Sequence, residues 1–80
     1  MRSKEALQLR IMELCDENNL TVNALARVSG ITQSTLNNIT GGRNNSATVS
    51  TIKKLCDGVG IDLPTFFDSP LFKDLEQEVV

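Results

Sequence analysis

The residues of this chain with the clearest capacity for chemistry are neutral hydrogen-bonding side chains between positions 33 and 38. Amides and hydroxyls fill five of these six positions, and no charged residue stands among them. A solvated helical face more often carries Lys and Glu in pairs four residues apart. Neutral amides can instead form two hydrogen bonds with the edge of a single base. The five side chains belong to Gln33, Ser34, Thr35, Asn37 and Asn38.

Two short helices are expected to position these side chains. Thr21 and Thr32 can each cap a helix, because a hydroxyl accepts a hydrogen bond from a free amide of the first turn. Gly30 suits the left-handed residue that ends the first helix. Leu36 and Ile39 are three residues apart and should face inward, which leaves the polar side chains outside. The expected helices cover residues 22–29 and 33–40.

The composition argues against an enzyme and against a membrane or secreted protein. The 80 residues include no His, the commonest general base and metal ligand. Cys15 and Cys56 are too few for a disulfide framework or a structural zinc site. No apolar run approaches the roughly 18 residues of a membrane span, and the first residues lack the apolar stretch of a signal peptide. We therefore expect a cytoplasmic protein with reduced thiols, no metal and no cofactor.

Charge is unevenly distributed along the chain. The net charge is −2, but residues 1–56 carry +3 and residues 57–80 carry −5. A negative total argues against unspecific binding of nucleic acid, whereas the first segment is mildly basic.

Apolar spacing predicts three further helices and a C-terminal extension. Leu7, Ile11 and Leu14 form the inward stripe of a first helix. Phe67 should close the core, and Arg10 should be solvated, with a phosphate contact as the alternative. Thr48 and Asp62 are suitable caps for the later helices. The expected ranges are residues 4–18, 49–58 and 63–67, with a sixth short helix within 71–80.

The paired helices resemble the helix-turn-helix of the lambda-repressor-like family, the Cro and phage-repressor group of DNA-binding domains. The similarity covers about residues 5–67. It implies an all-α, compact five-helix domain over residues 1–68, with residues 69–80 as a C-terminal extension. The residues that carry it most directly are Ala26, Gly30, Ile31, Thr32, Leu36 and Ile39.

This resemblance implies a sequence-specific regulator of transcription that binds a double-stranded DNA operator, and we expect a repressor. Residues 33–40 would lie in the major groove. The base-reading residues would be Gln33, Ser34, Asn37 and Asn38. The DNA backbone would contact Thr32, Thr35, Asn23, Arg43, Asn44 and Asn45.

The chain departs from the family pattern at two places. The family often carries Gln at the first position of its second helix, where it binds a phosphate, and this chain has Val22. Asn23 or the helix-terminal amides would have to replace that contact. Many relatives also pair a late helix-1 Arg with a Glu at the end of the third helix. The matching residues here are Cys15 and Thr40, which we predict to be neighbours.

Several apolar residues remain after the expected core is filled, and they favour a homodimer. The affinity of one helix-turn-helix for DNA is limited. A dimer could bind two half-sites about 34 Å apart and so raise that affinity. The same residues could instead fold back onto the first helix of their own domain. An alternative function is that of an antitoxin-like protein-interaction module of a toxin–antitoxin pair. The acidic tail would then bind the partner protein. The expected dimer contacts are Phe66, Leu71, Phe72 and Leu75, with Val79 beyond them.

Overall fold

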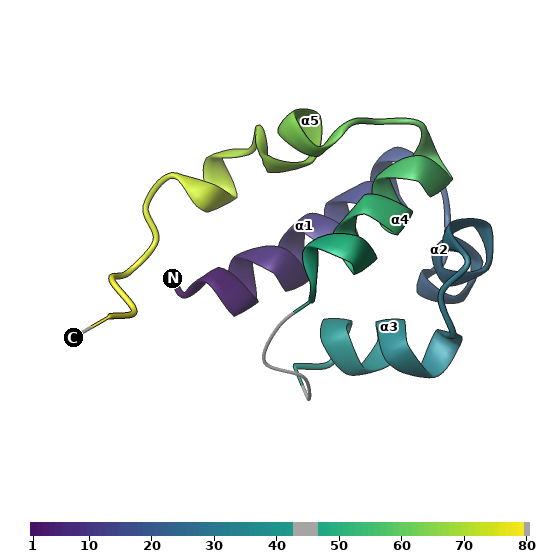
Figure 1. Cartoon of the computed structure of the whole chain (residues 1–80), viewed down its shortest axis with the longest axis horizontal. Coiled ribbons are helices and arrows are strands. Elements are labelled where there is room, and N and C mark those ends of the chain that lie inside the picture. The colour runs from purple at the N-terminus through teal and green to yellow at the C-terminus, as the bar shows by residue number, and fades with distance from the viewer. Residues whose placement is uncertain (43–46, 80) are drawn as a thin grey trace.

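The computed structural model describes residues 1–42 and 47–79, and this part of the chain is entirely helical. Five α-helices precede a single 3-10 turn, η1, and confirm the all-α prediction (Figure 1). Residues 43–46 and 80 lie outside the described residues. The elements are α1 (Ser3–Glu17), α2 (Val22–Ser29), α3 (Gln33–Thr40), α4 (Val49–Val59), α5 (Leu63–Phe67) and η1 (Pro70–Phe72).

Side-chain caps fix where four of the helices begin. In each case an oxygen of the residue before the helix accepts from the backbone amide three residues later, at 2.9–3.2 Å. Gly30 and Gly60 end α2 and α4 with φ of 69° and 77°, a left-handed conformation that glycine adopts without steric cost. These local signals explain why the predicted and observed helices agree closely. The caps are Thr21, Thr32, Thr48 and Asp62.

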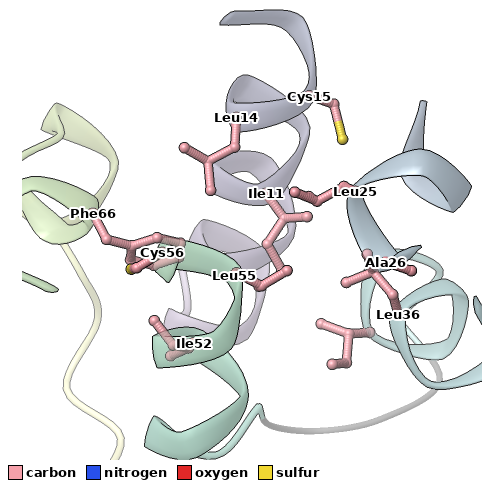
Figure 2. Close-up of a cluster of buried hydrophobic side chains, with 11 residues drawn as sticks. Ile11, Leu14, Cys15, Leu25, Ala26, Leu36, Ile52, Leu55, Cys56 and Phe66 are labelled. Atoms are coloured by element: carbon pink, nitrogen blue, oxygen red, sulfur yellow. The ribbon is translucent and has the colours of Figure 1, made fainter. Parts of the chain in front are cut away.

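All five helices contribute to one apolar core (Figure 2). Side chains from α1 and α4 form its centre, α2 and α3 close one side, and α5 closes another. Val22, at the position where the family often has Gln, packs against this cluster. The fully buried members with the largest side chains are Phe66, Ile11, Leu14, Leu25, Leu36, Leu55 and Cys56.

Gly58 allows α4 to lie close against α2. A Cβ at position 58 would overlap the Ser29 hydroxyl and would stand 3.1 Å from the Ser29 Cα. The Ser29 side chain is buried at this contact, and its hydroxyl has no hydrogen-bond partner among the described residues. The close packing of α4 on α2 therefore requires glycine at position 58.

Arg10 and Phe66 overturn two predictions. Arg10 is 6 % exposed, whereas the sequence suggested a solvated side chain. Its Nε donates to the carbonyl oxygen of Phe66 at 2.6 Å, and its guanidinium lies 5.6 Å from the centre of the Phe66 ring. Phe66 is fully buried and fills the place expected for Phe67, which is 43 % exposed. Because Phe66 belongs to the core of its own domain, its side chain cannot form the surface of a dimer.

The C-terminal segment folds back along α1 instead of forming the expected helix of two turns. Only η1 is helical after α5, and the chain beyond it is irregular as far as residue 79. The amide of Glu76 donates to the carbonyl of Met1 at 3.0 Å, and the Glu78 carboxylate accepts from the amide of Ser3 at 3.2 Å. About ten residues are too few for a stable helix without extensive packing, so contacts with α1 determine this conformation. Phe72 packs against the core.

Candidate nucleic-acid interface

The outward face of α3 carries only neutral polar groups. Gln33, Ser34, Thr35 and Asn37 are exposed and Asn38 is half-buried. The helix is anchored beneath them by two buried aliphatic side chains, Leu36 and Ile39. Figure 1 shows α3 at one edge of the molecule, with no other described helix covering it. The structure thus brings all four predicted base-reading residues onto one accessible helix.

Two threonines at the start of α3 hydrogen-bond to each other. The Thr32 hydroxyl accepts from the amide of Thr35 at 3.2 Å and donates to the Thr35 hydroxyl at 2.7 Å. Because Thr32 uses its own proton in this bond, the hydroxyl proton of Thr35 can still be donated outward. Both side chains are exposed. The N-terminal end of α3 therefore offers the Thr35 hydroxyl as a donor beside the first free backbone amides of the helix.

A hydrogen bond between side chains joins α2 and α3 on this surface. Asn37 Nδ2 donates to Asn23 Oδ1 at 3.4 Å, and both residues are exposed. The sequence predicts separate roles for these residues, with Asn37 at a base and Asn23 at the DNA backbone. Only the packing of α2 on α3 shows that they meet, because they are 14 positions apart.

Three of the predicted backbone contacts cannot be placed. Arg43, Asn44 and Asn45 lie outside the described residues. Just before them, Gly42 has φ of 77°, and a Cβ there would approach Gln8 Nε2 to 3.2 Å. Glycine adopts this left-handed conformation without steric cost and leaves room for the Gln8 side chain of α1.

The structure describes Cys15 and Thr40 separately, and no hydrogen bond between the two side chains is found among the described residues. Cys15 is buried, and burial raises the pKa of its thiol, so the group is neutral. Thr40 is half-buried, and its hydroxyl donates to the carbonyl of Leu36 at 3.1 Å. Each residue has its polar group satisfied or neutral without the other. Their direct contact stays a prediction.

The described residues offer little that would support a metal site or a membrane span. They contain no group of three or more metal-ligating side chains and no helix long and apolar enough to cross a membrane. An open depression beside α5 has two carboxylates in its lining, Asp62 and Asp68. Hydrogen bonds from Thr65 lower the pKa of Asp62, so this carboxylate is the ionised cap of α5.

A capped helix, a glycine turn and a second capped helix with an exposed polar face together define a helix-turn-helix DNA-binding domain. The sequence model of the Cro/C1-type helix-turn-helix DNA-binding domain matches residues 10–68. The chain belongs to this family, and it is a DNA-binding regulator of transcription.

A solved structure agrees with this assignment. The chain is similar to prophage Lp1 protein 11, with 37 % sequence identity and a TM-score of 0.80, and the match covers 94 % of this chain and 100 % of the other. No curated protein sequence matches the chain.

Proposed function

We propose that the protein is a transcriptional repressor that places α3 in the major groove of its operator. The observation that carries this proposal is the exposed face of α3, which offers amides and hydroxyls and no charge. An α-helix with its side chains is about 10–12 Å across, so α3 fits the major groove of B-DNA, which is about 12 Å wide. Repression would be steric, because a protein bound over a promoter blocks access to it.

Gln33 is the leading candidate for a base contact. It is the first residue of α3 and is exposed. In this docking geometry the N-terminal residues of the recognition helix approach the base edges. Its amide can bind adenine at N6 and N7 together. Ser34, Asn37 and Asn38 would line the same groove, so an operator rich in A·T pairs is expected.

Phosphates would be bound around the helix ends. Thr35 can donate its free hydroxyl proton, and Asn23 retains both protons of its Nδ2. The first amides of α2 and α3 add partial positive charge. These neutral groups would orient the protein on the duplex.

The test is selection of bound sites from a random DNA library, followed by the variant Gln33→Ala. The variant should lose about 1–3 kcal/mol at one base pair and relax the preference there. Arg27→Ala, on the exposed last turn of α2, serves as a matched control that should leave the preference unchanged. An equal loss on every sequence would show that Gln33 supplies affinity alone, and failure to select any motif would refute the proposal.

We also propose that the protein acts as a homodimer. Two copies would read two half-sites about 34 Å apart, as an isologous pair. The expected surface is Leu71, Phe72 and Leu75, which are half-buried against their own domain. The exposed ring of Phe67 lies 5.0 Å from that of Phe72 and extends this surface.

Sedimentation at several protein concentrations tests the dimer. Phe67→Ser should weaken self-association, whereas Val28→Ser, at a similarly exposed apolar residue of α2, should not. A wild-type protein that sediments as a monomer across the micromolar range would exclude a dimer formed without DNA.

A further inference from the structure

The hydrogen bond between α2 and α3 has a consequence for specificity. We propose that Asn23 is a positioning residue that sets the orientation of the Asn37 amide, and so determines the preference for one base pair. This inference rests on the proposed function of α3 as the element that reads the operator. Its geometric basis is the bond from Asn37 Nδ2 to Asn23 Oδ1 at 3.4 Å.

The two ends of an Asn amide are chemically opposite. The nitrogen donates two hydrogen bonds, and the oxygen only accepts. An unrestrained amide on an exposed helix can rotate by half a turn and exchange the two ends. Asn23 presents its oxygen to the nitrogen of Asn37, and while the Asn23 amide keeps this orientation the bond favours one of the two orientations of Asn37.

The held orientation suits adenine. Asn23 accepts one proton of Asn37 Nδ2, which leaves the second proton and Oδ1 of Asn37 unused. That proton and the oxygen can together bind N7 and the N6 amino group of adenine. Guanine has acceptors at both N7 and O6, so the oxygen of Asn37 would face another acceptor there. Restraining the amide thus favours adenine over guanine.

A purely structural role for this bond is disfavoured by its place on the surface. Both side chains are exposed. The packing of α2 on α3 comes from buried apolar residues beneath them, Leu25, Ala26 and Leu36. Removing the Asn23 side chain should therefore leave the fold and the position of α3 unchanged, so any change in base preference would come from the freed amide.

The test uses duplexes selected from a random library by the full chain. Asn37→Ala first identifies the base pair that this residue reads. Asn23→Ala should then reduce the preference at that base pair about two- to tenfold, the range expected for one neutral hydrogen bond. Asn23→Asp keeps the acceptor oxygen, so it should retain the preference although its negative charge weakens binding to every duplex. Thermal unfolding of each variant should match the wild type.

A double-variant cycle supplies the matched control. Asn23→Ala and Asn37→Ala should be strongly non-additive, whereas Asn23→Ala and Ser34→Ala, on the same face, should be additive. The inference is overturned if Asn37→Ala changes no base preference, or if Asn23→Ala weakens all duplexes equally. In both cases DNA binding itself would stand. If no duplex is selected at all, the proposed function fails and this inference fails with it.

Discussion

Replacing Arg10 by Met should destabilise the domain without affecting the DNA-binding surface. Met keeps an unbranched apolar side chain of similar length but removes every donor. Arg10 Nη2 also donates to the carbonyl of Thr65 at 3.3 Å, and that oxygen has a second partner in the amide of Asp68. The carbonyl of Phe66, by contrast, has no other hydrogen bond among the described residues. The substitution would therefore leave one buried acceptor without a donor.

The size of the effect follows from these contacts. A buried acceptor left without a partner costs about 1–3 kcal/mol. The ion pairs of Arg10 with Glu13 and Glu17, at 3.2 and 3.4 Å, involve half-exposed or exposed carboxylates. Such pairs contribute only about 0–1 kcal/mol each. Burying a neutral side chain in place of a charged one offsets part of the loss. We expect Arg10→Met to lower the free energy of unfolding by about 1–3 kcal/mol, a large share of the roughly 4–12 kcal/mol typical for 80 residues.

Urea unfolding followed by circular dichroism is the appropriate assay, because the chain has no Trp or Tyr. Glu13→Gln is the matched control, since it removes an ion pair and leaves the bonds to the carbonyls. Its effect should be below about 1 kcal/mol and should shrink at high salt. Measurements at several protein concentrations separate unfolding from dissociation. If Arg10→Met costs no more than Glu13→Gln, the bonds to the end of α5 do not stabilise the fold.

Three further substitutions test the packing and the caps. Gly58→Ala should destabilise by about 1–3 kcal/mol through overpacking, and Ser29→Ala should reduce that loss in a double variant, as urea unfolding would show. Asp62 caps α5, and hydrogen bonds from Thr65 hold the pKa of its carboxyl below the usual range. Its stabilisation should be present above the ordinary pKa of an Asp carboxyl and lost as the pH falls through the lowered pKa of the folded state, so the stability difference from Asp62→Asn should shrink in acid. Thr40→Glu should destabilise by placing a carboxylate at a half-buried position, and Cys15→Arg in the same chain should restore stability if the two residues are neighbours.

The helices could be predicted closely because their boundaries depend on local chemistry. Thr21 and Thr32 cap helices through amides three residues away, and Gly30 ends α2 through its own backbone conformation. Neither signal requires knowledge of distant residues. The exposed face of α3 follows directly, since burying Leu36 and Ile39 turns the remaining side chains outward.

The errors occurred where distant segments decide the outcome. Arg10 is buried only because the end of α5, 56 residues further on, supplies an acceptor. Phe66 and Phe67 are adjacent and equally apolar, so the sequence alone could not show which one faces α1. The tail has an apolar spacing that fits a helix, yet Glu76 pairs with the backbone of Met1 instead. The contact of Asn23 with Asn37 was missed for the same reason.

A neutral α3 has a consequence for how affinity and specificity are balanced. Binding to arbitrary DNA comes mainly from cations that neutralise phosphates, and residues 28–42 contain none. A protein with a net charge of −2 therefore gains little on unspecific sequences. On the surface of α3, discrimination would come from hydrogen bonding by amides and hydroxyls, and it would be sharper where an amide has a fixed orientation. A restrained Asn37 would raise discrimination without adding charge, and a second copy of the domain would raise affinity for paired half-sites more than for unspecific DNA. Under these proposals the neutral surface limits unspecific binding, the bond from Asn23 sharpens the base preference, and a second copy of the domain supplies affinity.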